Sequence, residues 1–332
     1  MALLEIKNLH TYFETKRGKI KAVYGVDLEV QEGKTLGVVG ESGSGKSQTA
    51  MSILKLFEKN QRIYEGDIFF DGKNLADYTV KEMEHIRGND ISIIFQEPMT
   101  SLNPVFTVER QLSEAFMLHQ NMNKKEAREN SIKMLEMVKI PNPEVVVKQY
   151  PFELSGGMNQ RVMIAMALAC TPKLLIADEP TTALDVTIQA QILKLMNDLK
   201  RETNTAIMFI THDLGVINQM ADDVAVMYCG QVVEKAPVDY IFREGATKYS
   251  HPYTEGLLTS IPSITSAKDE RLDTIPGSVP HPLDLPVGCR FAERCPYHTE
   301  KCINEMPDIV KVNESQEIRC FYPEKGVRSS GK

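Results

Sequence analysis

The chain lacks any long apolar run. None of its 332 residues falls in a stretch near the roughly 18 consecutive apolar residues that a membrane-spanning helix needs, so we expect no span. The first ten residues, MALLEIKNLH, contain no basic segment followed by an apolar block, which predicts no secretory signal. An excess of basic charge is also lacking, because 38 Lys and Arg face 45 Asp and Glu for a net charge of −7. This balance disfavours a broad nucleic-acid-binding surface.

Cysteine is sparse and unevenly distributed. Cys170 and Cys229 stand alone in hydrophobic surroundings and are predicted to be small core residues. The other four, which lie near the C-terminal end with the spacing C-x5-C-x6-C-x17-C, are Cys289, Cys295, Cys302 and Cys320. That spacing differs from the C-x2-C pairs of zinc ribbons, whereas four thiolates at looser spacing can hold a [4Fe–4S] cluster. Zinc and free or oxidised thiols remain alternatives. Without an export signal we expect a reducing compartment and no structural disulfides.

Short apolar runs alternate with helical patterns over most of the chain. The runs, which are typical of buried parallel strands, cover residues 35–39, 91–95, 174–177, 206–210 and 224–227. This alternation predicts an α/β domain with a largely parallel sheet. Hairpins are expected at residues 15–18 and 67–72. Nine of the 17 prolines lie at or beyond Pro252, so we expect a domain over 1–250, followed by a linker and a small irregular module over 251–332.

The segment that follows the 35–39 run matches G-x-x-x-x-G-K-S. Its residues are Gly40, Glu41, Ser42, Gly43, Ser44, Gly45, Lys46 and Ser47, and an amphipathic segment begins at Gln48. Glycines let successive N–H groups point at phosphate oxygens, and the following helix adds its positive end. Lys46 would neutralise phosphate charge and the Ser47 hydroxyl would bind Mg²⁺. With a strand before it and a helix after it, this pattern predicts a nucleoside-triphosphate site.

Other polar residues follow predicted strands or begin a predicted helix. Asp178 and Glu179 end the 174–177 run, where the first could hold Mg²⁺ and the second could polarise a water; two solvated acids are the alternative. Gln96 and His212 each follow a run, at the edge of a parallel sheet where ligands bind, although a lone Gln or His is usually an ordinary polar residue. A second anion-binding helix start is predicted from Ser155, Gly156 and Gly157, and a plain helix cap is the alternative.

Residues 3–260 resemble, in motif order, the nucleotide-binding subunit of an ABC transporter. Gly40–Ser47 resembles the Walker A loop, 174–179 resembles Walker B, and 154–158 resembles the signature motif. Gln96, Ala183-Leu184-Asp185 and His212 resemble the Q-loop, the D-loop and the switch histidine. The resemblance implies a parallel sheet core with an antiparallel β subdomain and a helical subdomain over about 98–165. It also implies Glu179 as general base and Phe13 as the aromatic that stacks on adenine. Tyr12 and Tyr24 are rivals for that stacking, and a plain core aromatic at Phe13 is the alternative.

One subfamily is especially similar, the D-type ATPases of oligopeptide and dipeptide importers. The matching segments are 95–104, 153–168, 211–216, 275–280 and 288–291. Met158 departs from the general signature, which has Gln there. The resemblance implies ATP and Mg²⁺, a tail [4Fe–4S] cluster, and a position on the cytoplasmic side of the membrane. It also implies a second ATPase subunit (an F-type homologue or a second copy), two permease subunits and an extracytoplasmic peptide-binding protein. Related cargo such as nickel chelates or glutathione stays open, and a soluble ATPase of DNA repair or translation is disfavoured.

Overall fold

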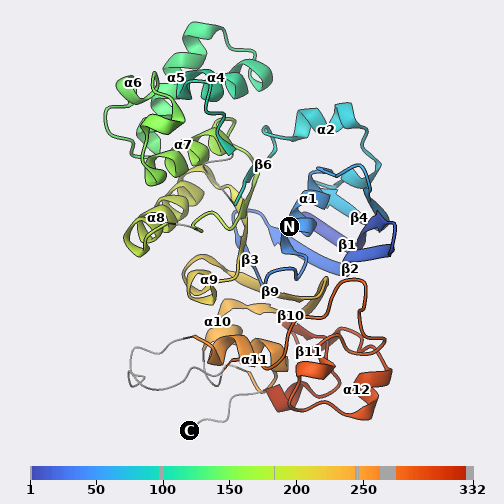
Figure 1. Cartoon of the computed structure of the whole chain (residues 1–332). Coiled ribbons are helices and arrows are strands. Elements are labelled where there is room, and N and C mark those ends of the chain that lie inside the picture. Colours follow the sequence, from blue (N-terminus) through green and yellow to red (C-terminus); the bar gives the residue numbers. More distant parts are fainter. Residues whose placement is uncertain are drawn as a thin grey trace. The chain divides into compact units, whose positions relative to one another are not determined.

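The computed structural model describes residues 2–96, 101–182, 184–243, 245, 247–261 and 274–326 (Figure 1). Residues 97–100 of the 95–104 match and Ala183 of the D-loop match lie outside the described residues. The chain divides into two compact units. Unit 1 comprises Met1–Leu3, Val30–Thr35 and Asp77–Ile210, and unit 2 comprises Leu4–Glu29, Leu36–Ala76 and Thr211–Lys332. No described helix combines the length and apolar character of a membrane span.

Unit 1 contains three neighbouring parallel strands. These are β6 (Ile91–Ile94), β7 (Leu174–Asp178) and β8 (Ala206–Thr211), and β7 pairs with both of the others. Every residue of β7 and β8 is buried, as expected for strands covered on both faces. The strands predicted from the apolar runs are therefore confirmed, and their carboxyl ends share one edge.

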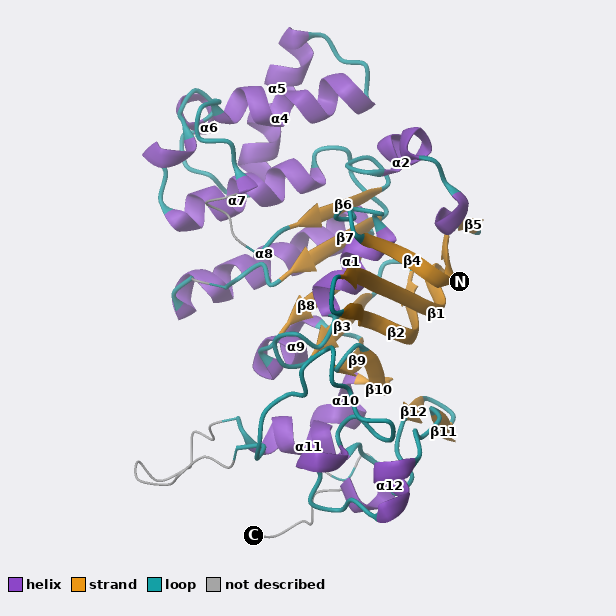
Figure 2. Cartoon of the chain, turned by 45° about the vertical axis from the view of Figure 1, so that its right-hand side comes forward, coloured by secondary structure: helices purple, strands orange, loops and turns teal. Residues whose placement is uncertain are grey.

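Helical segments lie before, between and after these strands in the described part of unit 1. They are α2 (Val80–Ile86), α4 (Val108–His119), α5 (Lys124–Met137), α6 (Pro143–Val146), the short 3₁₀ turn η2 (Pro151–Glu153), α7 (Gly156–Leu168) and α8 (Val186–Thr203). The start of α5 is fixed by a capping box, in which Asn123 accepts from the Glu126 N–H and Glu126 accepts from the Asn123 N–H. Helices α4, α5 and α7 pack on one another, and α7 also packs against β6 (Figure 2).

Unit 2 contains an antiparallel sheet in the order β2-β1-β4-β5. Its strands are β1 (Ala2–Thr15), β2 (Gly18–Gln31), β4 (Gln61–Phe70) and β5 (Lys73–Asn74). Both predicted hairpins are confirmed. In the second, Asp71 and Gly72 have φ values of 48° and 76°. This left-handed pair suits the two-residue turns that match strand twist.

A second group of strands in unit 2 joins the cassette to the C-terminal extension. β3 (Thr35–Val39) runs parallel to β9 (Asp223–Tyr228), and β9 pairs antiparallel with β10 (Gln231–Pro237). The strands β12 (Gln316–Ile318) and β11 (Val310–Asn313) continue this sheet as a hairpin beside β10. The extension was expected to be small and irregular; much of its described part is irregular, but it also supplies two short strands to the sheet.

The described helical segments of unit 2 are short. They are α1 (Lys46–Ile53), α9 (Leu214–Met220), α10 (Val238–Phe242), α11 (Pro252–Thr259) and α12 (Glu300–Asn304), with the 3₁₀ turns η3 (Ala292–Arg294) and η4 (Pro323–Gly326). A further 3₁₀ turn, η1 (Leu75–Asp77), ends at the boundary with unit 1.

A buried carboxylate ties the extension to β10. Glu234, 1% exposed, accepts from the His251 N–H and from Gln316 Nε2, each at 2.8 Å. Burial raises the pKa of Glu234.

Candidate nucleotide site and its comparison with known proteins

The loop between β3 and α1 has the backbone that phosphate binding requires. Gly40 has φ 154°, and a Cβ added there would collide with the carbonyl oxygen of Met227. Gly45 has φ 98°, and a Cβ would lie 2.5 Å from the carbonyl oxygen of Ala22. Only glycine satisfies both the conformation and the close approach at these positions. The loop therefore curls directly into the N-terminus of α1, where N–H groups favour an anion.

Lys46 lies folded over this loop. Its side chain is largely buried, and Nζ donates to the carbonyl oxygens of Gly40 at 2.7 Å and Glu41 at 3.0 Å. Ser47 and Gln48 occupy the first turn of α1, and Gln48 Oε1 accepts from Gln61 Nε2 at 2.7 Å. The ammonium group thus lies within the loop that would surround the phosphates, where it can exchange carbonyl partners for phosphate oxygens.

In unit 1 the acidic end of β7 meets Gln96. Glu179 Oε2 accepts from Gln96 Nε2 at 2.9 Å and from the Thr182 hydroxyl at 3.1 Å. The backbone of Glu179 has φ 48°, and its N–H donates to the Ile210 carbonyl oxygen at 2.9 Å. A glutamate in the left-handed region is strained, and such strain gathers at functional sites. Asp178, 4% exposed, precedes it at the strand end.

The predicted signature segment begins α7. Ser155 accepts from the Met158 N–H at 3.3 Å and so caps the helix. A Cβ added at Gly156 would meet only open space, whereas one at Gly157 would lie 3.1 Å from Ile188 of α8. Asp185 similarly caps α8 by accepting from the Ile188 N–H at 2.9 Å. The capping interpretation of Ser155 therefore holds, and the open face at Gly156 leaves room for a ligand.

His212, Phe13 and the rival aromatics belong to unit 2. His212 is exposed and directly precedes Asp213, the cap of α9. Phe13 is half-buried on β1 opposite Gln61. The rivals are engaged elsewhere, because Tyr12 stacks on Tyr64 with 4.7 Å between ring centroids and the Arg290 guanidinium lies 4.8 Å from the Tyr24 ring.

The four tail cysteines lie around one cavity. Cys289, Cys295, Cys302 and Cys320 line it together with mostly apolar or aromatic side chains, and all six cysteines are free thiols. Burial raises the pKa of Cys295 to about 11 and of Cys320 to about 12. Within the described residues, no three His, Cys, Asp or Glu side chains are grouped so as to hold a single metal ion.

Three contacts at the candidate site had no signal in the sequence. Tyr253 Oη accepts from the Glu41 N–H at 2.8 Å, and both terminal nitrogens of Arg294 lie on the Glu41 carboxylate. Thr182 adds the third, at Glu179. Tyr253 and Arg294 lie more than two hundred residues from Glu41 along the chain and belong to no local pattern, so only the folded chain reveals them.

A glycine loop that closes onto its own lysine between a buried strand and a helix defines a P-loop nucleotide-binding ATPase. The family described as "ABC transporter" matches residues 23–182, and the family described as "Oligopeptide/dipeptide transporter, C-terminal region" matches residues 233–302. The chain belongs to the ATP-binding proteins of the ABC transporters, of the type that carries this C-terminal region. Its ATPase assignment and its cassette fold follow from that membership.

Its relatives match it over nearly their whole length. It is 54% identical over 330 residues to the oligopeptide transport ATP-binding protein AppD of Bacillus subtilis, covering 99% of each chain. It is 49% identical over 322 residues to the oligopeptide transport ATP-binding protein OppD of Escherichia coli, covering 97% of this chain and 94% of OppD. Among solved structures, the ATP-binding cassette MJ0796, a dimer bound to ADP and phosphate, matches with a TM-score of 0.64 and 28% identity. That match covers 71% of this chain and 98% of MJ0796.

Proposed function

We propose that this chain is the ATP-hydrolysing subunit of an importer of dipeptides or oligopeptides. The observation that carries the proposal is the phosphate loop, in which glycines of positive φ and the inward Lys46 form an anion site. Its support for peptide cargo comes from the relatives, which are named for oligopeptide transport, and from the matching C-terminal region at 233–302. Nickel chelates and glutathione find no such support.

In the proposed reaction, the loop N–H groups and Lys46 bind the β- and γ-phosphates of ATP. Ser47, Asp178 and Gln96 would hold Mg²⁺, which neutralises charge that develops on the phosphate oxygens. Glu179 accepts a proton from the attacking water. Its hydrogen bond from Gln96 supports this role, because the amide orients the carboxylate.

A second cassette completes the proposed site. Ser155, Gly156 and Gly157 at the start of α7 would bind the γ-phosphate of ATP held by the other subunit, and Asp185 would lie at the same interface. His212 would contact the γ-phosphate, and Phe13 would stack on adenine, since Tyr12 and Tyr24 are engaged within the protein. Binding then closes the pair by adding phosphate contacts, and hydrolysis removes them. The dimer of MJ0796 with ADP and phosphate supports this arrangement.

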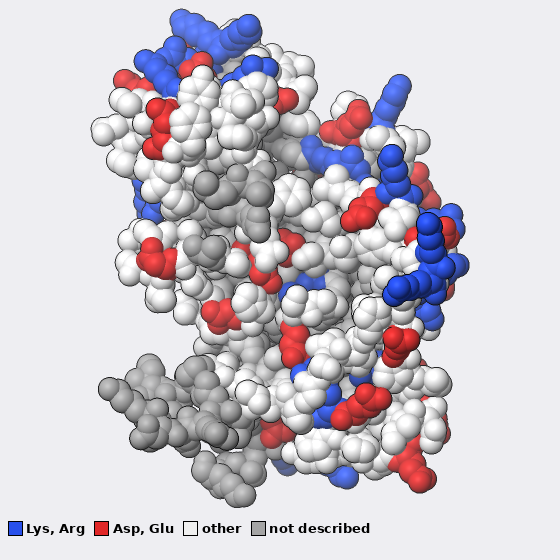
Figure 3. Space-filling model, in the orientation of Figure 1, with Lys and Arg blue, Asp and Glu red and all other residues white. Residues whose placement is uncertain are grey.

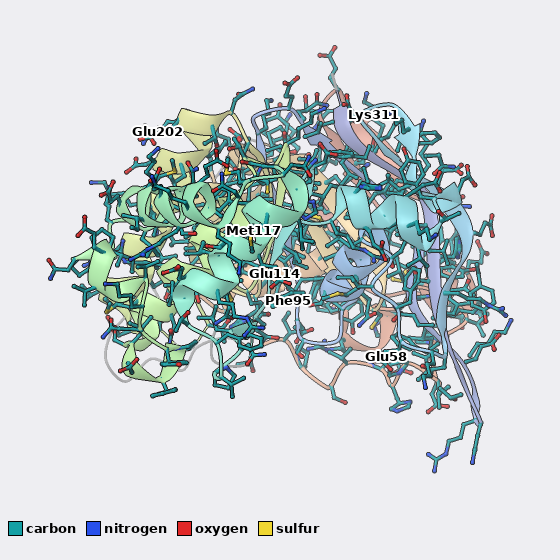
Figure 4. All side chains as sticks on the ribbon, turned by 90° about the horizontal axis from the view of Figure 1, so that it is seen from above. Glu58, Phe95, Glu114, Met117, Glu202 and Lys311 are labelled. Atoms are coloured by element: carbon teal, nitrogen blue, oxygen red, sulfur yellow. The ribbon has the colours of Figure 1, made fainter. Side chains whose placement is uncertain are left out.

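The helical segment at about 98–165 would receive a permease helix. Large apolar side chains are exposed there, among them Leu118 at 67% and Phe152 at 68%. Phe95, after β6, and Met117, on α4, are also exposed (Figure 4). Such exposure favours a protein partner. The proposed location is peripheral, at the cytoplasmic face of the membrane, on two permease subunits that also serve an extracytoplasmic peptide-binding protein.

We propose no nucleic-acid partner. On the face drawn in Figure 3, Lys and Arg side chains gather over α5 and over the β1–β2–β4 sheet, with Asp and Glu among them. A nucleic-acid surface would call for a basic stripe with few acids in it. The proposed domain division remains a cassette over 1–250 and an extension over 251–332.

The four tail cysteines are proposed to hold a [4Fe–4S] cluster with a structural role. Support comes from the cavity that all four line. Protein purified without oxygen should contain about four irons per chain and absorb in the visible range. Replacing Cys295 by Ser should remove both signals, whereas replacing Cys170 by Ser should keep them. A colourless, iron-free wild-type protein would dismiss the cluster.

The experiment for the transport proposal is affinity purification of the full chain from membranes in mild detergent, followed by mass spectrometry. Two permease subunits, a second ATPase and a peptide-binding lipoprotein should co-purify. Vesicles reconstituted with the purified assembly should then transport a labelled peptide only when ATP is supplied on the side of the membrane where this subunit lies. Recovery of ribosomes or DNA, or uptake of a nickel chelate in place of peptides, would refute the assignment.

A further inference from the structure

The C-terminal extension reaches the phosphate loop through one buried arginine. The Arg294 side chain is 5% exposed and lies across the Glu41 carboxylate, with Nη1–Oε2 at 2.7 Å and Nη2–Oε1 at 3.0 Å. Its Nε donates to the Pro276 carbonyl oxygen at 2.9 Å, and Nη1 also donates to Tyr228 Oη at 3.3 Å. A bidentate ion pair with these additional hydrogen bonds fixes both the position and the rotation of the guanidinium.

Glu41 is itself held at three points. Its carboxylate accepts from Arg294, its N–H donates to Tyr253 Oη at 2.8 Å, and its carbonyl oxygen accepts from Lys46 Nζ at 3.0 Å. Two of these partners come from the C-terminal side of the chain and the third is the phosphate-binding lysine. Moving Glu41 therefore moves the carbonyl oxygen on which Lys46 rests.

A second arginine from the same short segment supports the other side of the loop. Arg290, 5% exposed, donates through Nη1 to the Cys229 carbonyl oxygen. Cys229 and Gly230 form the left-handed turn between β9 and β10, and the Gly230 N–H donates to the Ser44 carbonyl oxygen at 2.8 Å. Residues 290–294 thus contact the loop directly at Glu41 and, through this turn, at Ser44.

Charge adds a second consequence at Glu41. A carboxylate within a loop that binds polyphosphate repels its ligand, and the Glu41 side chain is only 30% exposed, so water screens it incompletely. The Arg294 guanidinium cancels that charge where it stands. Loss of Arg294 would leave the phosphate loop in place, but the Glu41 carboxylate in that loop would then carry an unpaired negative charge.

We propose that Arg294 is a positioning residue for nucleotide binding, through which the C-terminal extension sets the affinity of the phosphate loop for ATP. The inference rests on the proposed ATP site at Gly40–Ser47. It adds to that site a residue from outside the cassette motifs that never touches the nucleotide. Residues 290–294 act as a brace, and Glu41 is the point at which the brace meets the loop.

The test compares four forms of the full chain: wild type, Arg294→Gln, Glu41→Gln, and both changes together. Equilibrium binding of a fluorescent ATP analogue with Mg²⁺, and the KM and kcat of hydrolysis, are measured for each. Arg294→Gln should weaken ATP binding roughly tenfold, as expected when a partly buried carboxylate loses its partner, and should raise KM more than it lowers kcat. Glu41→Gln with Arg294→Gln should recover most of that affinity, because the repelling charge is gone.

Arg319→Gln is the matched control. Arg319 lies in the same extension, but its side chain donates to the carbonyl oxygens of Val232 at 3.1 Å and Pro307 at 3.2 Å. It should leave ATP affinity at the wild-type value. Equal affinity in wild type and Arg294→Gln, or a double variant as weak as Arg294→Gln, would overturn the proposal, since a purely structural role predicts no rescue. Wild-type protein that binds no ATP would instead refute the nucleotide site itself.

Discussion

Replacing Glu179 by Gln isolates the proton acceptor from everything else at the strand end. The amide has the shape of the carboxylate and keeps an oxygen that can accept from Gln96 Nε2 and the Thr182 hydroxyl, now at 2.9 and 3.1 Å. We therefore expect the strained backbone at this position, with φ 48°, to keep its conformation in the variant. The phosphate loop lies in other residues, so ATP affinity should stay within about twofold of wild type.

The loss should fall on the chemical step alone. General-base catalysis contributes about 10²–10⁴-fold, or about 3–5 kcal/mol of barrier at 1.36 kcal/mol per tenfold. We expect single-turnover phosphate release to slow by that factor, measured on full-length protein in the assembly with which it purifies. The control is Glu202→Gln, a change at an exposed glutamate near the end of α8 (Figure 4). Hydrolysis by Glu179→Gln at the rate of that control would show that another group takes the proton.

Further changes test the loop, the signature helix and the attachment of the extension. Gly40→Ala should abolish ATP binding and destabilise the fold by several kcal/mol, because its Cβ would strike a backbone carbonyl, whereas Gly72→Ala meets open space and should cost only about 1 kcal/mol in urea unfolding; similar costs would contradict the steric argument. Ser155→Ala should cost about 1 kcal/mol by loss of the cap, and Ser155→Arg should also spare ATP binding to the isolated chain yet stop hydrolysis in the assembly; normal turnover would exclude the shared site. Glu234→Ala should lower the free energy of unfolding by about 2 kcal/mol or more, because it leaves two buried donors without an acceptor. The control Glu317→Ala removes a surface ion pair with Lys235 and should cost at most about 1 kcal/mol. Equal unfolding midpoints for the two variants would show that the buried carboxylate does not anchor the extension.

Local patterns carried most of the prediction. The phosphate loop could be found because the residues that the motif requires, Gly40, Gly45, Lys46 and Ser47, fall within eight consecutive positions. The meeting of Gln96 and Glu179 followed from the rule that parallel strands end at one edge, although the two residues are 83 positions apart. The left-handed φ of Glu179 had no such signal, because glutamate gives no hint of that conformation.

The C-terminal extension was predicted less well, for a physical reason. Strands β11 and β12 are short and partly polar, and they exist because β12 finds the edge of β10 and a buried partner in Glu234. Strand preference of this kind belongs to the context and not to the residues. The Arg294–Glu41 pair joins residues 253 positions apart. In the sequence each of the two is only a single charged residue, so nothing there indicates that they pair.

That pair also bears on why the extension is built as it is. A nearly buried ion pair is weak evidence for stability, because desolvation consumes much of the attraction and apolar residues of similar size often stabilise as well. An apolar contact could therefore have joined the extension to the loop. Unlike an apolar contact, a bidentate ion pair fixes the direction of the Glu41 side chain. It thereby also fixes the Glu41 carbonyl oxygen, which accepts a hydrogen bond from Lys46. The phosphate loop and residues 290–294 fall within the same compact unit, although the composition change near residue 245 separates them in the sequence. The extension is thus part of the structure that shapes the nucleotide site, and its arginines set the loop geometry that the motif alone leaves free.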